Sequence, residues 1–381
     1  MTKMLLITNV YNRAIAIENG LIVDIFSMEN FDISNYPNSK NIDASGYNLR
    51  AGLIDTHIHG IGGYATDDAK SSSIFAMSEK LASFGVTGFF PTLYAANPDK
   101  MITEINAVVE AIGKEKGARI LGINLEGPFL NPAKCGAQSP EGLCKPSTDI
   151  INSLIKAGKG YIKAITIAPE LKYIDKIIDI ATNNGIIVSL GHTNASYDQA
   201  CNAIEMGAKN ITHAFNAMSP LNHREPGVAG AALFNDNVCC ELIADGKHVD
   251  KHLVCHTIKT KPKDKTILVS DSLGITATAK ESYMANGIEV MLKDNVAVSK
   301  KTPSLLCGSA LTLNKAVKNV IDWGINENQA FRMASSNTAK LYSLKKMGQI
   351  KKDYKADVVL FDKNMDAICV IIDGEVIDEH F

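Results

Sequence analysis

The chain has 381 residues, with 39 lysines and arginines against 41 aspartates and glutamates, so its formal net charge is −2. Charged residues make up 21% and hydrophobic residues 46%, which is typical of a globular protein and excludes a disordered chain. The balanced charge gives no support to nucleic-acid binding through bulk positive charge, and no apolar run approaches the roughly 20 residues of a membrane span. The first ten residues do not resemble a secretory signal, so we expect a cytoplasmic protein with no nucleic-acid or membrane partner.

Both ends of the chain predict short β-strands. In the first 50 residues, apolar and polar positions alternate, and Asn19-Gly20 is typical of a hairpin turn. Residues 346–381 show a similar alternation, with Asp373-Gly374 between two apolar stretches. We therefore expect residues 1–50 and 346–381 to form one small β-sandwich domain, into which the middle of the chain is inserted.

The middle of the chain, residues 51–345, predicts a repeating order of strand, loop and helix. Asn97 before Pro98 indicates the start of one helix, and Ser196 with Gln199 indicates a capping box at another. Eight apolar strand candidates follow one another as GLIDTHI, TGFFPT, RILGINLE, IKAITIA, IIVSLGH, NITHAF, CCELIA and TILVSD. Eight such units fit an α/β protein with a (β/α)8 TIM barrel, and a doubly wound sheet is the alternative.

One segment, residues 127–147, breaks this order. It contains four prolines and no helical or strand periodicity. A loop of this length inside a compact domain is usually functional or disordered. Because it directly follows the third strand candidate, we expect it to lie over the mouth of the barrel as a lid.

Polar residues with metal-binding side chains stand at the ends of five strand candidates. They are His57, His59, Glu126, His192, His213 and Asp271. The first two are two residues apart and would share one face of a strand, and the active site of a barrel gathers at this end of its strands. Taken singly, each histidine has a simpler explanation as a hydrogen-bonded core residue, and Asp271 as a helix cap. Together, four imidazoles and two carboxylates predict a site for zinc or a similar divalent ion.

Seven short motifs, in a fixed order along the chain, resemble those of a known protein family. The motifs DTHIHG, EGPFLNP, GHTNA, THAFNAM, HREPG, ADGKHV and SDSLG resemble the amidohydrolase superfamily and, within it, the N-acetylglucosamine-6-phosphate deacetylase family. The resemblance spans nearly the whole chain. It implies a TIM barrel of the amidohydrolase type that hydrolyses the acetamide of N-acetylglucosamine 6-phosphate to glucosamine 6-phosphate and acetate. The alternatives are another phosphorylated N-acetyl amino sugar, such as N-acetylgalactosamine 6-phosphate, and, more remotely, a non-catalytic binding protein with this fold.

The resemblance also implies roles for the residues at the metal site. His57 and His59 would bind one divalent ion, His192 and His213 a second, and Glu126 would serve both. One or two ions are compatible with this set, with zinc as the first expectation and iron or manganese as alternatives. Asp271, beside the metal, would act as general base and then as general acid, and His248 would stabilise the oxyanion.

The substrate contacts rest on the resemblance alone. It implies a homodimer in which Arg224 reaches the neighbouring active site and binds the substrate phosphate; a surface arginine is the alternative. The residues expected to contact substrate are Ala137, Gln138, Asn216, Ala217, Arg224, His248, Leu306, Cys307 and Gly308.

Two positions depart from the family pattern. The lid has Gln138 where the family usually has histidine, and Cys307 stands where alanine or serine is common. Both changes leave the expected metal ligands intact and leave the identity of the sugar open. Cys135, also on the lid, is a candidate for redox sensitivity only if it is exposed.

Overall fold

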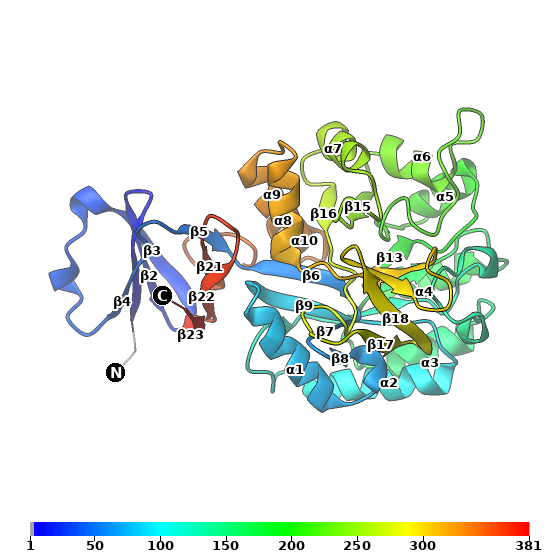
Figure 1. Ribbon diagram of the computed structural model, residues 1–381, viewed down its shortest axis with the longest axis horizontal. Helices are drawn as coiled ribbons and strands as arrows, with labels where there is room; N and C mark the ends of the chain where they lie inside the picture. The colour runs from blue at the N-terminus through cyan, green and yellow to red at the C-terminus, as the bar shows by residue number, and fades with distance from the viewer. Residues whose placement is uncertain (1–3, 381) are drawn as a thin grey trace.

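The computed structural model describes residues 4–380. Figure 1 shows two parts, a barrel surrounded by helices and a smaller body of β-sheets in which the first and last strands of the chain lie together. None of the helices within the described range combines the length and the apolar character needed to cross a bilayer.

The larger part is a nearly closed barrel of eight parallel strands, which confirms the predicted fold class. The strands follow one another around the ring as β6 (Leu53–Ile58), β9 (Val86–Leu93), β11 (Ile123–Glu126), β12 (Ile162–Ile167), β13 (Ile187–Leu190), β14 (Asn210–Ile211), β15 (Cys239–Leu242) and β16 (Thr266–Leu268). A short strand, β10 (Arg119–Ile120), also pairs with β9. Beyond β16, the amide of Asp271 donates to the carbonyl oxygen of His57 at 2.8 Å, so the last strand of the ring returns to the first.

The helices pack outside the barrel and carry the predicted start signals. The Asn97 side chain accepts from the amide of Lys100, and Ser196 with Gln199 forms the capping box. The helices are α1 (Ser71–Ala82), α2 (Pro98–Ala111), α3 (Thr148–Gly158), α4 (Ile174–Asn183), α5 (Tyr197–Glu205), α6 (Gly227–Phe234), α7 (Lys251–Thr260), α8 (Leu313–Asp322), α9 (Glu327–Met333) and α10 (Ser336–Leu341).

The smaller part consists of two four-stranded sheets. One contains β1 (Leu5–Val10), β2 (Arg13–Glu18), β3 (Leu21–Ser27) and β4 (Lys40–Asp43), and the other contains β5 (Asn48–Ala51), β21 (Val358–Phe361), β22 (Ala367–Ile372) and β23 (Glu375–Glu379). Side chains of both sheets, among them Ile7 and Ile371, share one buried apolar cluster. Arg119 of the barrel forms two hydrogen bonds with Asp357, at 2.9 and 3.0 Å, and so ties this part to the barrel.

A further antiparallel sheet lies between β16 and α8, in a region to which the sequence analysis assigned no strands. Its strands are β17 (Ser282–Ala285), β18 (Ile288–Lys293), β19 (Val296–Ser299) and β20 (Leu306–Ser309). Asn286 has a φ of 46° and Asp294 one of 52°, so both turns use the left-handed conformation that Asn and Asp tolerate. The residues of β20 border the cavity described below. A small hairpin, β7 (Gly60–Ile61) with β8 (Tyr64–Ala65), follows the first barrel strand.

Candidate metal centre and active-site cavity

The six metal-binding side chains expected from the sequence come together at one end of the barrel. His57 lies on β6 and Glu126 ends β11, whereas His192, His213 and Asp271 lie in the segments that follow β13, β14 and β16. Each is at most 7% exposed. Because parallel strands end at the same rim of a barrel, these six residues lie close together although they are spread between positions 57 and 271 of the sequence.

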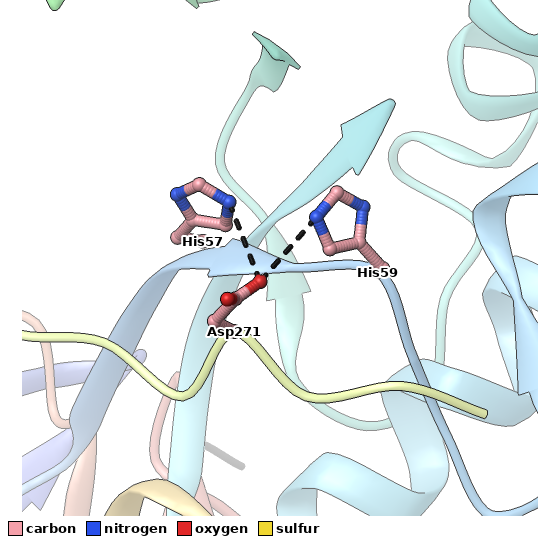
Figure 2. Close-up of side chains that lie close together, drawn as sticks. All are labelled: His57, His59 and Asp271. Carbon is pink, nitrogen blue, oxygen red and sulfur yellow. Dashed lines mark ion pairs between the residues drawn. The ribbon is translucent and has the colours of Figure 1, made fainter. Parts of the chain in front are cut away.

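His57, His59 and Asp271 form the first group of donor atoms. The Oδ1 atom of Asp271 lies 3.6 Å from Nε2 of His57 and 3.5 Å from Nε2 of His59. Figure 2 shows both rings directed toward this carboxylate. All three residues offer donor atoms within 4.8 Å of one another.

His192, His213 and Glu126 form the second group. The Nε2 atoms of the two histidines lie 3.1 Å apart, and each is 2.9 Å from Oε1 of Glu126. The other carboxylate oxygen, Oε2, lies 3.1 Å from Nε2 of His59. Glu126 therefore faces both groups, as expected for a ligand that serves two ions.

These distances fit a divalent ion. Ligand atoms about 2.1 Å from a tetrahedral zinc ion lie roughly 3.4 Å from one another, and the first group has spacings of 3.5 and 3.6 Å. Among the described residues, the buried Nε2 atom of His57 has no hydrogen-bond partner. An orphaned imidazole nitrogen next to two carboxylates is readily explained if it binds a cation.

The electrostatics of the site also favour positive charge. Burial disfavours the charged form of His57, but the carboxylates of Glu126, Glu241 and Asp271 outweigh it and raise the pKa of His57 well above its usual value. Burial likewise opposes charge on Glu126, yet the surrounding histidines hold its pKa well below the usual range. A cation bound by the same nitrogens would use the attraction that otherwise draws protons to them.

Three of these residues, just after the ends of their strands, have a left-handed backbone conformation. His192, His213 and Asp271 have φ values of 48°, 27° and 50°. Residues other than glycine rarely adopt this left-handed region, and such strain, of order 1–3 kcal/mol per residue, collects at functional sites. Asp271 is also held from both sides, because its amide donates to His57 and its carbonyl oxygen accepts from Ser309 at 2.7 Å.

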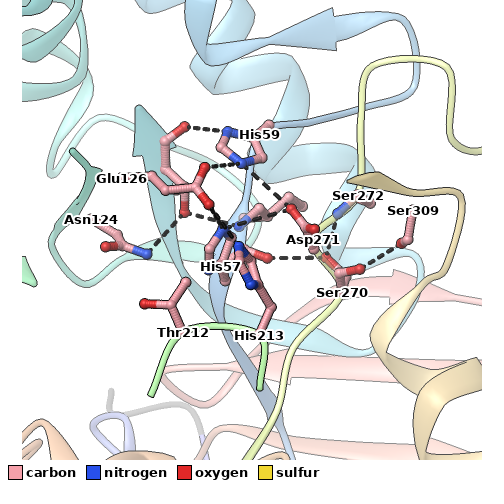
Figure 3. A network of polar contacts seen from close by, with 12 residues as sticks. His57, His59, Asn124, Glu126, Thr212, His213, Ser270, Asp271, Ser272 and Ser309 are labelled. Atoms are coloured by element: carbon pink, nitrogen blue, oxygen red, sulfur yellow. Dashed lines mark hydrogen bonds and ion pairs between the residues drawn. The ribbon is translucent and has the colours of Figure 1, made fainter. Parts of the chain in front are cut away.

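Polar residues for which sequence reasoning had no signal surround the site, and Figure 3 shows Asn124 and Ser309 among them. Asn124 donates to the carbonyl oxygen of Thr56 at 3.0 Å, and Ser272 donates to that of Gly60 at 2.8 Å. Tyr94 stacks on the ring of His59, with centroids 3.8 Å apart and planes within 5°. Because Tyr94 follows β9 without a recognisable motif, only the fold brings it to the metal ligands.

A cavity of about 360 Å³ opens beside these candidate ligands, and five of the six line it. Eight of the nine residues expected to contact substrate line it, namely Ala137, Gln138, Asn216, Ala217, His248, Leu306, Cys307 and Gly308. The ninth, Arg224, is exposed and is not part of the lining. Lys134 and Gly136 also line the cavity, so the middle of the segment 127–147 forms part of the cavity wall.

The lid residue Gln138 is turned inward. It is 4% exposed, its amide nitrogen donates to Oε2 of Glu126 at 2.5 Å, and its oxygen accepts from the amide of Ala95 at 2.9 Å. Both polar ends are thus engaged by the protein. This glutamine connects the segment 127–147 to a carboxylate of the candidate metal site as well as lining the cavity.

His248 is held by a residue that the sequence analysis did not single out. Nδ1 of His248 lies 2.7 Å from Oδ2 of Asp245, whose Oδ1 accepts from the amides of Lys247 and His248. The buried Nε2 atom has no partner among the described residues. Burial opposes charge on His248, but Asp245 raises its pKa above the usual value. The spacing of Asp245 and His248 in ADGKHV is the signal that could have revealed this pair.

Known proteins resemble the chain over nearly its whole length. A sequence model of the amidohydrolase family matches residues 49–377. An N-acetylglucosamine-6-phosphate deacetylase of Bacillus subtilis is 32% identical, over 89% of this chain and 87% of the relative. An N-acetylgalactosamine-6-phosphate deacetylase of Escherichia coli O157:H7 is 29% identical, over 85% of this chain and 86% of the relative. The crystal structure of N-acetylglucosamine-6-phosphate deacetylase from Pasteurella multocida superposes with a TM-score of 0.91 at 30% identity, over 98% of this chain and 99% of that one.

Proposed function

The chain belongs to the amidohydrolase family, and we propose that it hydrolyses the acetamide of N-acetylglucosamine 6-phosphate to glucosamine 6-phosphate and acetate. The observation that carries this proposal is the convergence of four histidines, Glu126 and Asp271 beside one cavity. The similarity to deacetylases of phosphorylated N-acetyl amino sugars supports the substrate class.

We propose that His57 and His59, with Asp271, hold one divalent ion, and that His192 and His213 hold a second, with Glu126 between them. Zinc is the first choice for this donor set, and iron or manganese are alternatives. When bound, such an ion supplies positive charge that makes water a better nucleophile near neutral pH and stabilises a developing oxyanion.

Asp271 is the general base and acid of the reaction. The residue is 7% exposed and lines the cavity, and its Oδ1 atom lies 3.6 and 3.5 Å from Nε2 of His57 and His59. It takes a proton from the attacking water, and it then gives a proton to the nitrogen of the departing amine as the C–N bond breaks. Both proton transfers need a carboxylate close to the reacting carbon. The aspartate side chain is short and its backbone turn is strained, so the carboxylate of Asp271 stays beside the cavity.

His248 stabilises the oxyanion. His248 lines the cavity, its Nε2 atom has no hydrogen-bond partner among the described residues, and its Nδ1 atom is anchored by Asp245. As the acetyl carbonyl is attacked, negative charge develops on its oxygen, and a preorganised N–H donor lowers the energy of that state. The raised pKa of His248 favours the protonated ring that can donate from Nε2.

We further propose a homodimer in which Arg224 completes the phosphate site of the neighbouring chain. This arginine is exposed and lies apart from the cavity of its own chain, whereas the remaining expected contacts line that cavity. A guanidinium binds two phosphate oxygens at once. The division into a domain of residues 1–50 with 346–381 and a barrel domain of residues 51–345 is likewise our proposal, and a cytoplasmic location stays a prediction.

A second candidate substrate is N-acetylgalactosamine 6-phosphate. Gln138, which the family pattern would replace with histidine, lines the cavity, and a deacetylase of that sugar is among the relatives. The test is acetate release from the 6-phosphates of N-acetylglucosamine, N-acetylgalactosamine and N-acetylmannosamine, each with zinc, iron or manganese. We expect the glucosamine compound to give the highest kcat/KM. No acetate from any sugar with any metal would refute the proposed function.

A further inference from the structure

We propose that Glu241 is a positioning residue that links the two halves of the metal centre and sets the ring orientation of His57. The inference rests on the metal site of the proposed function, although it concerns a residue outside the set of expected ligands. Glu241 lies on β15 and is 1% exposed.

The hydrogen bonds of this carboxylate reach both groups of ligands. Its Oε2 atom lies 3.1 Å from Nδ1 of His57 and accepts from the amide of His213, also at 3.1 Å. Its Oε1 atom accepts from the side-chain amide of Asn210 at 2.7 Å. Figure 3 shows the rings of His57 and His213 side by side, one from each group. One carboxylate oxygen therefore contacts a ligand ring of the first group and the backbone of a ligand of the second.

The contact with His57 decides which ring nitrogen faces the metal centre. A carboxylate flanked by amide donors acts as an acceptor, so the proton of a neutral His57 ring lies on Nδ1. The lone pair is then on Nε2, the nitrogen that faces Glu126 and Asp271 at 3.5 and 3.6 Å. A hydrogen bond of this kind orients a ligating imidazole and increases its basicity.

The contact with His213 stabilises a strained turn. His213 has a φ of 27°, and the amide of the next residue, Ala214, donates to the backbone oxygen of Glu241 at 2.8 Å. Glu241 therefore holds this turn through both its side chain and its main chain. Displacing the carboxylate would disturb His57 and His213 together.

The burial of Glu241 argues against a role in packing alone. Side chains inside a TIM barrel are mostly bulky and apolar, and burying a carboxylate is unfavourable unless its partners compensate for the lost hydration. An apolar side chain would fill this position at lower cost. A carboxylate at this position is explained if it orients the ring of His57 and the backbone of His213.

The test is metal binding by variants of the full-length chain. Metal-free Glu241→Met, which removes the acceptor, is titrated with Co²⁺ and Zn²⁺, following the Co²⁺ absorption bands and the number of ions bound. We expect affinity for the ion at His57 and His59 to fall 10- to 100-fold, the usual effect of losing such a partner, with an altered Co²⁺ spectrum. Wild-type affinity and spectrum in folded Glu241→Met would overturn the inference.

Glu241→Gln keeps the test decisive if the methionine variant does not fold. It preserves the size and one acceptor but removes the charge, so we expect a smaller yet measurable loss of affinity; unchanged affinity would again overturn the inference. Glu104→Gln is the matched control, because Glu104 on α2 is also 1% exposed, and its carboxylate pairs with Lys100 of the same helix at 3.6 Å rather than with a candidate metal ligand. It should bind metal as the wild type does. Acetate release by the wild type, measured separately, tests the proposed function and leaves this inference untouched.

Discussion

Replacing His248 with alanine tests the oxyanion role most directly. His248 lines the cavity, and its buried Nε2 atom has no hydrogen-bond partner among the described residues. It is therefore a donor held ready for a group that arrives with the substrate. Removing one such donor typically lowers kcat by about 10²–10³-fold, or about 2.7–4 kcal/mol. We expect His248→Ala to lose kcat in this range while it retains its metal content.

The hydrogen bonds of His248 also predict the sign of its pH dependence. The pKa of Asp245 lies below its usual value because hydrogen bonds from His248 and two backbone amides outweigh the effect of burial. Its ionised carboxylate only accepts, so Nδ1 of His248 always holds a proton, and Nε2 is a donor only when the ring is charged. Because the pKa of His248 is raised, this donor is present below the raised pKa and is lost as the pH rises through it.

The assay is kcat for acetate release as a function of pH, at saturating substrate and with metal content checked. Wild-type kcat should fall at alkaline pH as His248 loses its proton. The His248→Ala variant should lack this fall, because it has no ring to deprotonate. His252→Ala is the control, since the side chain of His252 is 83% exposed and pairs with Asp250 at the start of α7. A loss of kcat below about tenfold, or an unchanged alkaline decline in His248→Ala, would contradict the proposed role of His248.

Four further predictions concern other parts of the molecule. Asp271→Asn should lower kcat at least ~10²-fold with its metal still bound, as shown by metal analysis; wild-type turnover would remove Asp271 from its role. Arg224→Ala should raise KM for the phosphorylated sugar far more than for N-acetylglucosamine, and equal losses would argue against a phosphate contact. Gln138→His should raise activity on the glucosamine compound if the chain is a weakened form of that enzyme, whereas no change or a fall would favour another sugar. Arg119→Met leaves the buried Asp357 without its guanidinium partner and should lower the free energy of unfolding in urea by about 3–5 kcal/mol; an unchanged midpoint would show that this ion pair does not tie the two parts together.

Much of the site could be predicted because its signals are local. His57 and His59 are two residues apart, which predicts one strand face for both, and Asp271 follows an apolar run that was predicted as a strand. Parallel strands of a barrel end at one rim, so the strand assignment was sufficient to bring their terminal residues together. The helix starts at Asn97 and Ser196 were predictable for the same reason, since a capping side chain bonds an amide two or three residues away.

The inserted sheet of β17 to β20 was not predicted, although its turns carry local signals. Asn286-Gly287 is a typical hairpin pair, but the eight strand candidates already accounted for a complete barrel. The sheet matters to the site because its last strand borders the cavity and Ser309 bonds the backbone of Asp271. The repeated order of strand and helix does not reveal whether additional strands are inserted between two of its units.

The amino-acid sequence alone was therefore sufficient to identify the types of donor atom, the strands that present them and the family to which the chain belongs. Only the tertiary structure decided that Glu241 bonds His57, 184 residues away, that Tyr94 stacks on His59, and that Gln138 turns inward to Glu126. The difference arises from how far apart in the sequence the interacting residues lie. Periodicity and capping depend on neighbours within a few residues, whereas a hydrogen bond across the barrel exists only once the ring of strands has closed and burial has removed water as the competing partner.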